Sequence, residues 1–84
     1  AIKALKKKIE VYPNPIEHVF HVKNTTNERL NGLFLLTDIS GRIIDQFDLN
    51  IETGNSIAVN IDVSSGVYFL SSDELSVKEK LIVE

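Results

Sequence analysis

The chain has 84 residues, no cysteine and a formal net charge of −3 at pH 7, and 43% of its residues are apolar. This length supports one small domain with a modest core, and without cysteine no disulfide or thiolate metal site contributes to it. Four of the nine basic residues lie in the first eight positions, so residues 9–84 hold five basic and twelve acidic residues, a net charge of −7. An acidic body repels phosphate, so we expect no nucleic-acid partner.

The apolar pattern predicts seven short strands and almost no helix. We expect the strands at Lys8–Tyr12, Glu17–Lys23, Leu33–Asp38, Arg42–Leu49, Asn55–Ile61, Gly66–Ser71 and Val77–Val83. The nearly continuous apolar run LFLLT, at 33–37, is typical of a central strand that is buried on both faces. Short strands separated by turns about every 8–12 residues predict a seven-stranded antiparallel β-sandwich of immunoglobulin-like type.

The turn residues fit this arrangement. In the stretch YPNP, Pro13 and Pro15 each fix φ and lack an N–H, so we expect the chain to leave the first strand, turn at Asn14 and cross between sheets. In TDISGR, Asp38 and Gly41 occupy positions typical of a hairpin that closes through a glycine bulge. Plausible core residues are Leu33, Leu35, Ile43, Ile57, Val59, Val67, Phe69, Leu81 and Val83.

A search for catalytic chemistry is negative. His18 and His21 are three residues apart, which places them on opposite faces of a strand and prevents them from chelating one metal as a local pair. The aspartates are scattered through turns and strand faces, and the serines lack a nucleophile elbow or a nearby basic partner. The sequence therefore predicts no enzyme, no cofactor, no metal site and no small-molecule substrate.

Four blocks of the sequence carry a resemblance to a known family. They are VYPNPIEHVFHV, LFLLTDISGRII, NIDVSSGVYFL and the closing KEKLIVE. In this order and spacing, over residues 9–84, the chain resembles the type A C-terminal sorting domain of the type IX secretion system of Bacteroidota. The matching positions are Pro13-Asn14-Pro15, Asp38 with Gly41-Arg42, Gly66-Val67-Tyr68-Phe69 and Lys80-Leu81-Ile82-Val83.

The resemblance implies a folded, non-catalytic secretion signal. Its cargo would cross the inner membrane by the general secretory route, and the periplasmic domain would then meet the shuttle, the outer-membrane translocon and the sortase. The sortase would usually remove the domain as the cargo reaches the cell surface or the medium. On this view residues 1–7 are a linker from the cargo and residues 8–84 are the sorting domain, with the cut in that linker or upstream of it.

Two alternatives stay open from sequence. A retained, uncleaved immunoglobulin-like docking module would share every motif. An adhesive or carbohydrate-binding sandwich would be expected to expose an aromatic platform, and the chain has no tryptophan. A dimer formed at an edge strand, or by swapping one, is also open, since the last strand is expected at a sheet edge.

Roles within the motifs follow from residue type. Proline and glycine set backbone geometry, so we expect structural roles for Pro13, Pro15, Gly41 and Gly66. Polar and cationic side chains are the better candidates for contacts with the machinery, namely Arg42, Tyr68, Lys78 and Lys80.

Overall fold

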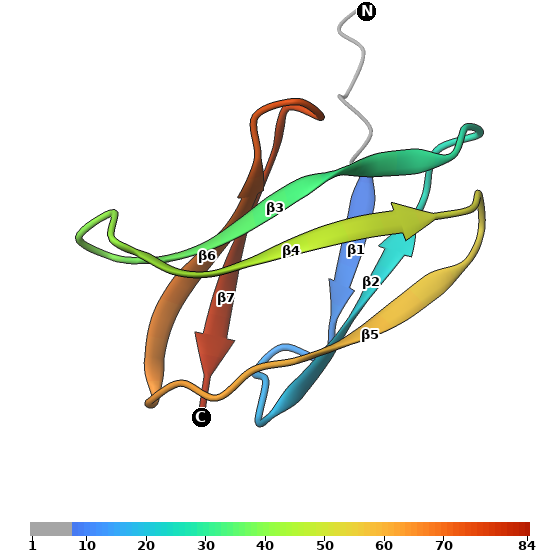
Figure 1. The fold of residues 1–84 in the computed structure, drawn as a ribbon. Coiled ribbons are helices and arrows are strands. Elements are labelled where there is room, and N and C mark those ends of the chain that lie inside the picture. The colour runs from blue at the N-terminus through green and yellow to red at the C-terminus, as the bar shows by residue number, and fades with distance from the viewer. Residues whose placement is uncertain (1–7) are drawn as a thin grey trace, which may run out of the picture.

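The computed structural model describes residues 8–84, which form the predicted immunoglobulin-like β-sandwich (Figure 1). Its strands are β1 (Ile9–Tyr12), β2 (Val19–Asn24), β3 (Leu30–Asp38), β4 (Ile43–Ile51), β5 (Ser56–Asn60), β6 (Gly66–Ser72) and β7 (Val77–Val83). One antiparallel sheet has the order β1-β2-β5 and the other the order β4-β3-β6-β7. Residues 1–7, the predicted linker, lie outside the described residues. Residues 8–84 contain no helix long and apolar enough to cross a membrane.

Two neighbouring strands extend two or three residues beyond their predicted bounds at one end. β3 begins at Leu30 and β4 ends at Ile51, and these two buried residues pair with each other across the strands. The sequence did not predict the first residues of β3, because Asn31 and Gly32 are of types that are common in turns. The strand pairing, which a local pattern does not reveal, overrides that preference.

The connection between β2 and β3 is held by a buried asparagine. The side chain of Asn24 is fully buried at the end of β2, and its amide donates hydrogen bonds to the carbonyl oxygens of Glu28 at 2.7 Å and Ile51 at 2.9 Å. Its Oδ1 accepts from the N–H and the hydroxyl of Thr26. Because every polar atom of the side chain has a partner, the buried amide stabilises the connection rather than destabilising the core.

Side chains from both sheets form one core. Its buried apolar members are Ile9, Ile16, Phe20, Val22, Leu30, Phe34, Leu36, Leu49, Ile51, Val59, Ile61, Leu70, Val77, Leu81 and Val83. The predictions for Val59, Leu81 and Val83 are confirmed. Ile57 is half-buried and packs against this core, as expected.

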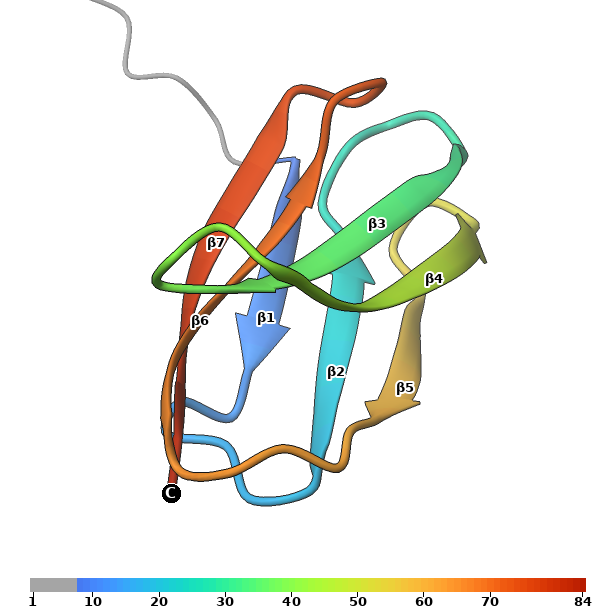
Figure 2. The ribbon, with the colours of Figure 1, turned by 60° about the vertical axis from the view of Figure 1, so that its left-hand side comes forward.

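Five residues predicted for the core lie outside it. They are Leu33, Leu35, Ile43, Val67 and Phe69, and they occupy the outer face of the four-stranded sheet. The prediction that the run 33–37 is buried on both faces is also wrong, since no other element within residues 8–84 forms a layer over that face (Figure 2). Alternation does not identify the inner face when both faces of a strand are apolar.

Candidate recognition surface

The hairpin between β3 and β4 is organised by one carboxylate. Oδ1 of Asp38 accepts hydrogen bonds from the Ser40 N–H at 2.9 Å, the Ser40 hydroxyl at 2.6 Å and the Arg42 N–H at 3.0 Å. Gly41 has φ of 89°, which glycine adopts without strain. The hydrogen bond from the Ser40 hydroxyl is the main reason why the pKa of Asp38 lies below its usual value. The motif D-x-x-G-R therefore describes a turn that closes on its own aspartate.

Arg42 extends from this hairpin into solvent. Its Nε lies 3.4 Å from Oδ2 of Asp38, and 77% of its side chain is exposed. An exposed ion pair of this kind contributes little to stability. The guanidinium is therefore available to a partner.

The block at the start of β6 closes a second turn. Gly66 begins the strand with φ of 157°, at the edge of the region that favours glycine. Two residues later, the ring of Tyr68 packs against the core and its hydroxyl donates to the carbonyl oxygen of Ser64 at 2.8 Å. A tyrosine that bonds back to a nearby upstream carbonyl is the device known as a tyrosine corner in β-sandwiches. Its ring and its hydroxyl both serve the fold.

The segment Pro13–Pro15 carries the chain from one sheet to the edge of the other. Beyond it, the fully buried Ile16 forms a parallel bridge with Val83. The Ile16 N–H donates to the carbonyl oxygen of Ile82 at 2.7 Å, and the Ile16 carbonyl oxygen accepts from the Glu84 N–H at 2.8 Å. The chain then returns to the three-stranded sheet as β2. The prediction that the prolines take the chain from one sheet to the other is therefore wrong, because β1 and β2 pair in the same sheet and the segment between them only contacts the edge of β7. β2 also begins later than expected, at Val19.

These contacts close only part of the free edge of β7. Oδ1 of Asn14 accepts from the Ile82 N–H at 3.2 Å, so both outward backbone groups of Ile82 have partners. Outward groups recur at every second residue of an edge strand, so the next ones belong to Lys80 and Lys78. No backbone hydrogen bond from another described residue reaches them. The predicted open edge is therefore limited to the lysine-bearing part of β7.

The lysine side chains project from the outer face of the four-stranded sheet. Lys78 and Lys80 are exposed and lie opposite Ser71 and Phe69 of β6. The Lys78 ammonium lies 5.1 Å from the centre of the Phe69 ring, within the range of a cation–π interaction.

All four motifs lie at one end of the four-stranded sheet. Asp38, at the end of β3, pairs with Tyr68 of β6, which in turn pairs with Leu81 of β7. Val83 pairs with Gly66 on one side, while its other side contacts the residue that follows the proline motif. Segments separated by as many as 68 residues in the chain therefore share one surface region.

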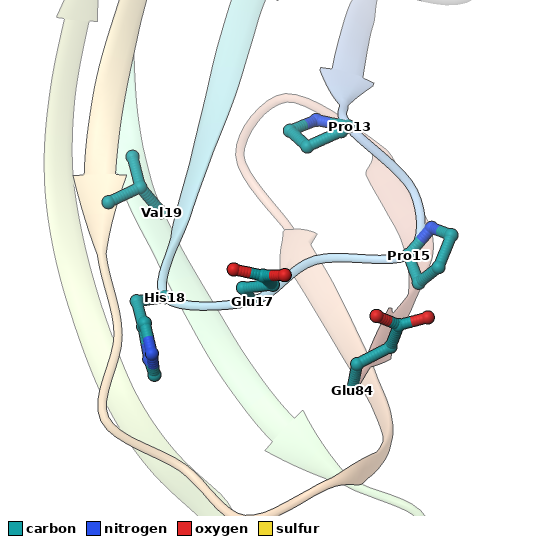
Figure 3. Close-up of a pocket in the computed structure, with 6 residues that line it drawn as sticks. All are labelled: Pro13, Pro15, Glu17, His18, Val19 and Glu84. Atoms are coloured by element: carbon teal, nitrogen blue, oxygen red, sulfur yellow. The ribbon is translucent and has the colours of Figure 1, made fainter.

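An open pocket of about 350 Å³ lies beside this region (Figure 3). Its lining is Pro13, Pro15, Glu17, His18, Val19 and Glu84. Figure 3 shows the Glu84 carboxylate directed toward Pro15. Within residues 8–84 no group of three or more histidine, aspartate or glutamate side chains is placed to hold a metal ion.

Comparison with known proteins decides the family. The family model of the secretion system C-terminal sorting domain matches residues 10–84. The chain belongs to this family. No curated protein and no solved structure matches it.

The match confirms the resemblance drawn from the four motifs. As a type IX sorting domain, the protein is a signal for export to the cell surface or the extracellular space, and it interacts with the type IX secretion machinery. Sorting domains are non-catalytic.

Two residues of the sorting domain were missed from sequence. Ile16 is the buried bridge to β7, and its signal was an apolar residue directly after Pro15, between two expected strands. Ile82 is 43% exposed on the outer face, beside the lysines. The apolar run Leu81–Val83 contains its signal, because in a strand three consecutive apolar residues place one on the opposite face from the other two.

Proposed function

We propose that this sorting domain acts as a folded secretion signal that is removed after export. In the periplasm it is recognised by the shuttle and directed to the outer-membrane translocon, and the sortase then removes it as the cargo is attached to the cell surface. The cut falls before β1, within residues 1–7 or upstream of them.

The gathering of the four motifs supports recognition in the folded state. Asn14 and Ile82 are 68 residues apart in the chain but meet in one hydrogen bond. In an unfolded chain these motifs have no fixed relation to one another. A receptor that contacts the four motifs together therefore recognises the folded sandwich. A domain that cannot fold is then not recognised and its cargo is not exported.

Within the motifs we assign contact with the machinery to the exposed cations Arg42, Lys78 and Lys80. Tyr68 acts through the turn that it closes, because its hydroxyl is already bonded to Ser64. Pro13, Pro15, Gly41 and Gly66 set the backbone on which these side chains stand. The assignment thus separates residues that contact the machinery from residues that maintain the backbone geometry of the recognition surface.

A fusion experiment tests the proposal. Residues 1–84 are attached to the C-terminus of a fluorescent protein that carries a general secretory signal, and the fusion is expressed in a bacterium with a working type IX system. We expect fluorescence at the surface or in the medium, on a product that has lost a mass close to the 9.4 kDa of the chain. A matched fusion with Phe34→Asp, which places a charge in the core, should remain in the periplasm or be degraded.

Each other outcome has a definite meaning. Export without loss of mass favours the retained docking module and overturns removal by the sortase. Periplasmic retention of a folded, protease-resistant wild-type fusion overturns the proposal as a whole. Export of the Phe34→Asp fusion overturns recognition in the folded state.

A further inference from the structure

The outer face of the four-stranded sheet carries six large apolar side chains among polar ones, where a solvated sheet face is ordinarily polar. Its apolar members are Leu33, Leu35, Ile43, Val67, Phe69 and Ile82. Leu33 is 41% exposed, Ile43 is 56% exposed and Ile82 is 43% exposed. The other three are half-buried but are not among the residues that pack against the core.

The strand register brings outward apolar side chains of all four strands near one another. Thr37 of β3 pairs with Ile43 of β4 on one side and with Phe69 of β6 on the other. Val67 of β6 lies opposite Ile82 of β7. Outward apolar side chains thus occur on all four strands, interleaved with polar partners such as Thr37, and exposed apolar side chains gathered on one face of a small domain indicate an interaction site.

The other sheet provides an internal comparison. Its outward positions are Glu10, Tyr12, Val19, His21, Lys23, Ser56, Ala58 and Asn60, so most of them are polar or small. Large apolar side chains thus take two of these eight outward positions, Tyr12 and Val19, against six of the fourteen outward positions of the four-stranded sheet.

Charge on the apolar face is also unlike that of the body. Residues 9–84 carry a net charge of −7 and only five basic residues, two of which, Lys78 and Lys80, project from this face. Among the outward positions of these four strands in the described chain, the one acidic residue is Asp48, opposite Leu33. The face therefore combines apolar side chains with a local excess of positive charge.

The combination of apolar side chains and positive charge limits which kind of partner can bind this face. An anionic bilayer would attract the two lysines, but it would repel the acidic body of the domain. Two copies packed through this face would set two lysines of each copy against one Asp48 carboxylate of the other and would leave positive charge unpaired at the border. A protein surface that is apolar at its centre and carries carboxylates at its border satisfies both the apolar strip and the lysines.

We propose that the outer face of the four-stranded sheet is the docking face through which the domain binds an apolar, carboxylate-bordered protein surface of the type IX machinery. The inference rests on the proposed function and adds the surface and the chemistry of the partner to it. Lys78 and Lys80 lie at the border of this face, and Leu33, Phe69 and Ile82 provide its apolar contact.

Paired variants of the fluorescent fusion test this inference. Leu33→Thr with Ile82→Thr removes two exposed apolar side chains but retains residues that favour strands. Lys78→Glu with Lys80→Glu reverses the charge at the border. The matched controls are Val19→Thr with Ala58→Thr, and Lys23→Glu, all on the outer face of the three-stranded sheet. Urea unfolding of each purified domain establishes that it folds.

We expect each outer-face pair to reduce export by about tenfold or more and each control to stay within about twofold of wild type. A second readout is competition, in which the free wild-type domain in the periplasm blocks export of the wild-type fusion. The outer-face variants should fail to compete, while the controls should compete as wild type does. If the threonine pair does not fold, the lysine pair carries the test, because its side chains are exposed.

Export and competition by both outer-face pairs at wild-type levels, with the wild-type fusion exported, overturns this inference and the assignment of contact to Lys78 and Lys80, but leaves the role as a removable sorting signal intact. Failure of the wild-type fusion to be exported overturns the proposed function, and the inference with it. Sedimentation should show a monomer. A dimer that the outer-face variants abolish, or binding of the domain to vesicles of phosphatidylglycerol, assigns the face to a different occupant and overturns the inference.

Discussion

Oδ1 of Asn14 accepts a hydrogen bond from the N–H of Ile82 at 3.2 Å, across 68 residues of sequence. The contact joins the proline motif to the terminal strand, two of the four blocks that characterise the family. It also occupies a backbone group that would otherwise lie open at the edge of β7. One asparagine side chain thus both anchors the β1–β2 connection to β7 and protects the edge of that strand.

Replacing this asparagine should weaken the end of β7. We expect Asn14→Ala to lower the free energy of unfolding by about 0.5–1.5 kcal/mol, the usual net contribution of a hydrogen bond. Amide hydrogen exchange at Ile82 should become faster. Urea unfolding and exchange measured by NMR check the two effects.

Two controls accompany Asn14→Ala. Asn50→Ala, at an exposed position of β4, should leave both measurements unchanged. Asn14→Asp retains an acceptor oxygen and should retain most of the protection of the Ile82 amide. Equal exchange at Ile82 in the alanine variant and the wild type would show that the side chain does not hold the edge.

The Asp38 hairpin should lose stability in acid. Its hydrogen bonds, first of all that from the Ser40 hydroxyl, hold the pKa of the carboxyl below the ordinary 3.8. Because the folded state has the lower pKa, the stabilisation is complete above the ordinary value and is lost as the pH falls through the folded value. Asp38→Asn should therefore be less stable than wild type near neutral pH, and the difference should narrow in acid.

Urea midpoints at about pH 6 and about pH 2 measure this narrowing. A constant difference between Asp38→Asn and wild type over that interval would contradict the assignment. Ser40→Ala tests the cause directly, since loss of the hydroxyl should raise the pKa of Asp38, as followed by the chemical shift of its carboxyl carbon.

Tyr68 should respond as a structural residue. Tyr68→Phe retains the ring but removes the hydrogen bond to Ser64, so we expect the free energy of unfolding to fall by about 0.5–1.5 kcal/mol. Export of the fluorescent fusion should be retained at temperatures where the variant is folded. Tyr12→Phe, on the exposed ring that stacks on His21, is the matched control and should leave stability nearly unchanged. Loss of export from a fully stable Tyr68→Phe variant would instead identify the hydroxyl as a contact.

The two faces of β3 should differ sharply when leucines are shortened. Leu36 is fully buried, so Leu36→Ala should lower the free energy of unfolding by about 2–5 kcal/mol. Leu33 is 41% exposed, and Leu33→Ala should cost less than about 1 kcal/mol. Thermal or urea unfolding of the pair checks the expectation, and equal losses would contradict the orientation of β3.

Sequence alone determined the features that depend on neighbours in the chain. The order of the seven strands follows from short apolar stretches separated by turn residues. The β3–β4 hairpin follows from Asp38 and Gly41, whose partners lie within four residues. The end of β1 at Pro13 follows from the fixed φ and missing N–H groups of the prolines. Each of these is a local effect, so the pattern of residues is enough to identify it.

Only the tertiary structure decided which face of the four-stranded sheet is inside. In β3 the pair Leu33 and Leu35 and the pair Phe34 and Leu36 are equally apolar, so the free energy of burial does not distinguish them before the sheets pack. Packing against the other sheet buries Phe34 and Leu36 and leaves Leu33 and Leu35 outside. Likewise, the bridge from Ile16 to β7 depends on the register of strands at opposite ends of the chain. The docking face proposed here consists largely of residues that the sequence had assigned to the core, because the register of distant strands, rather than local apolarity, determines which apolar side chains meet solvent.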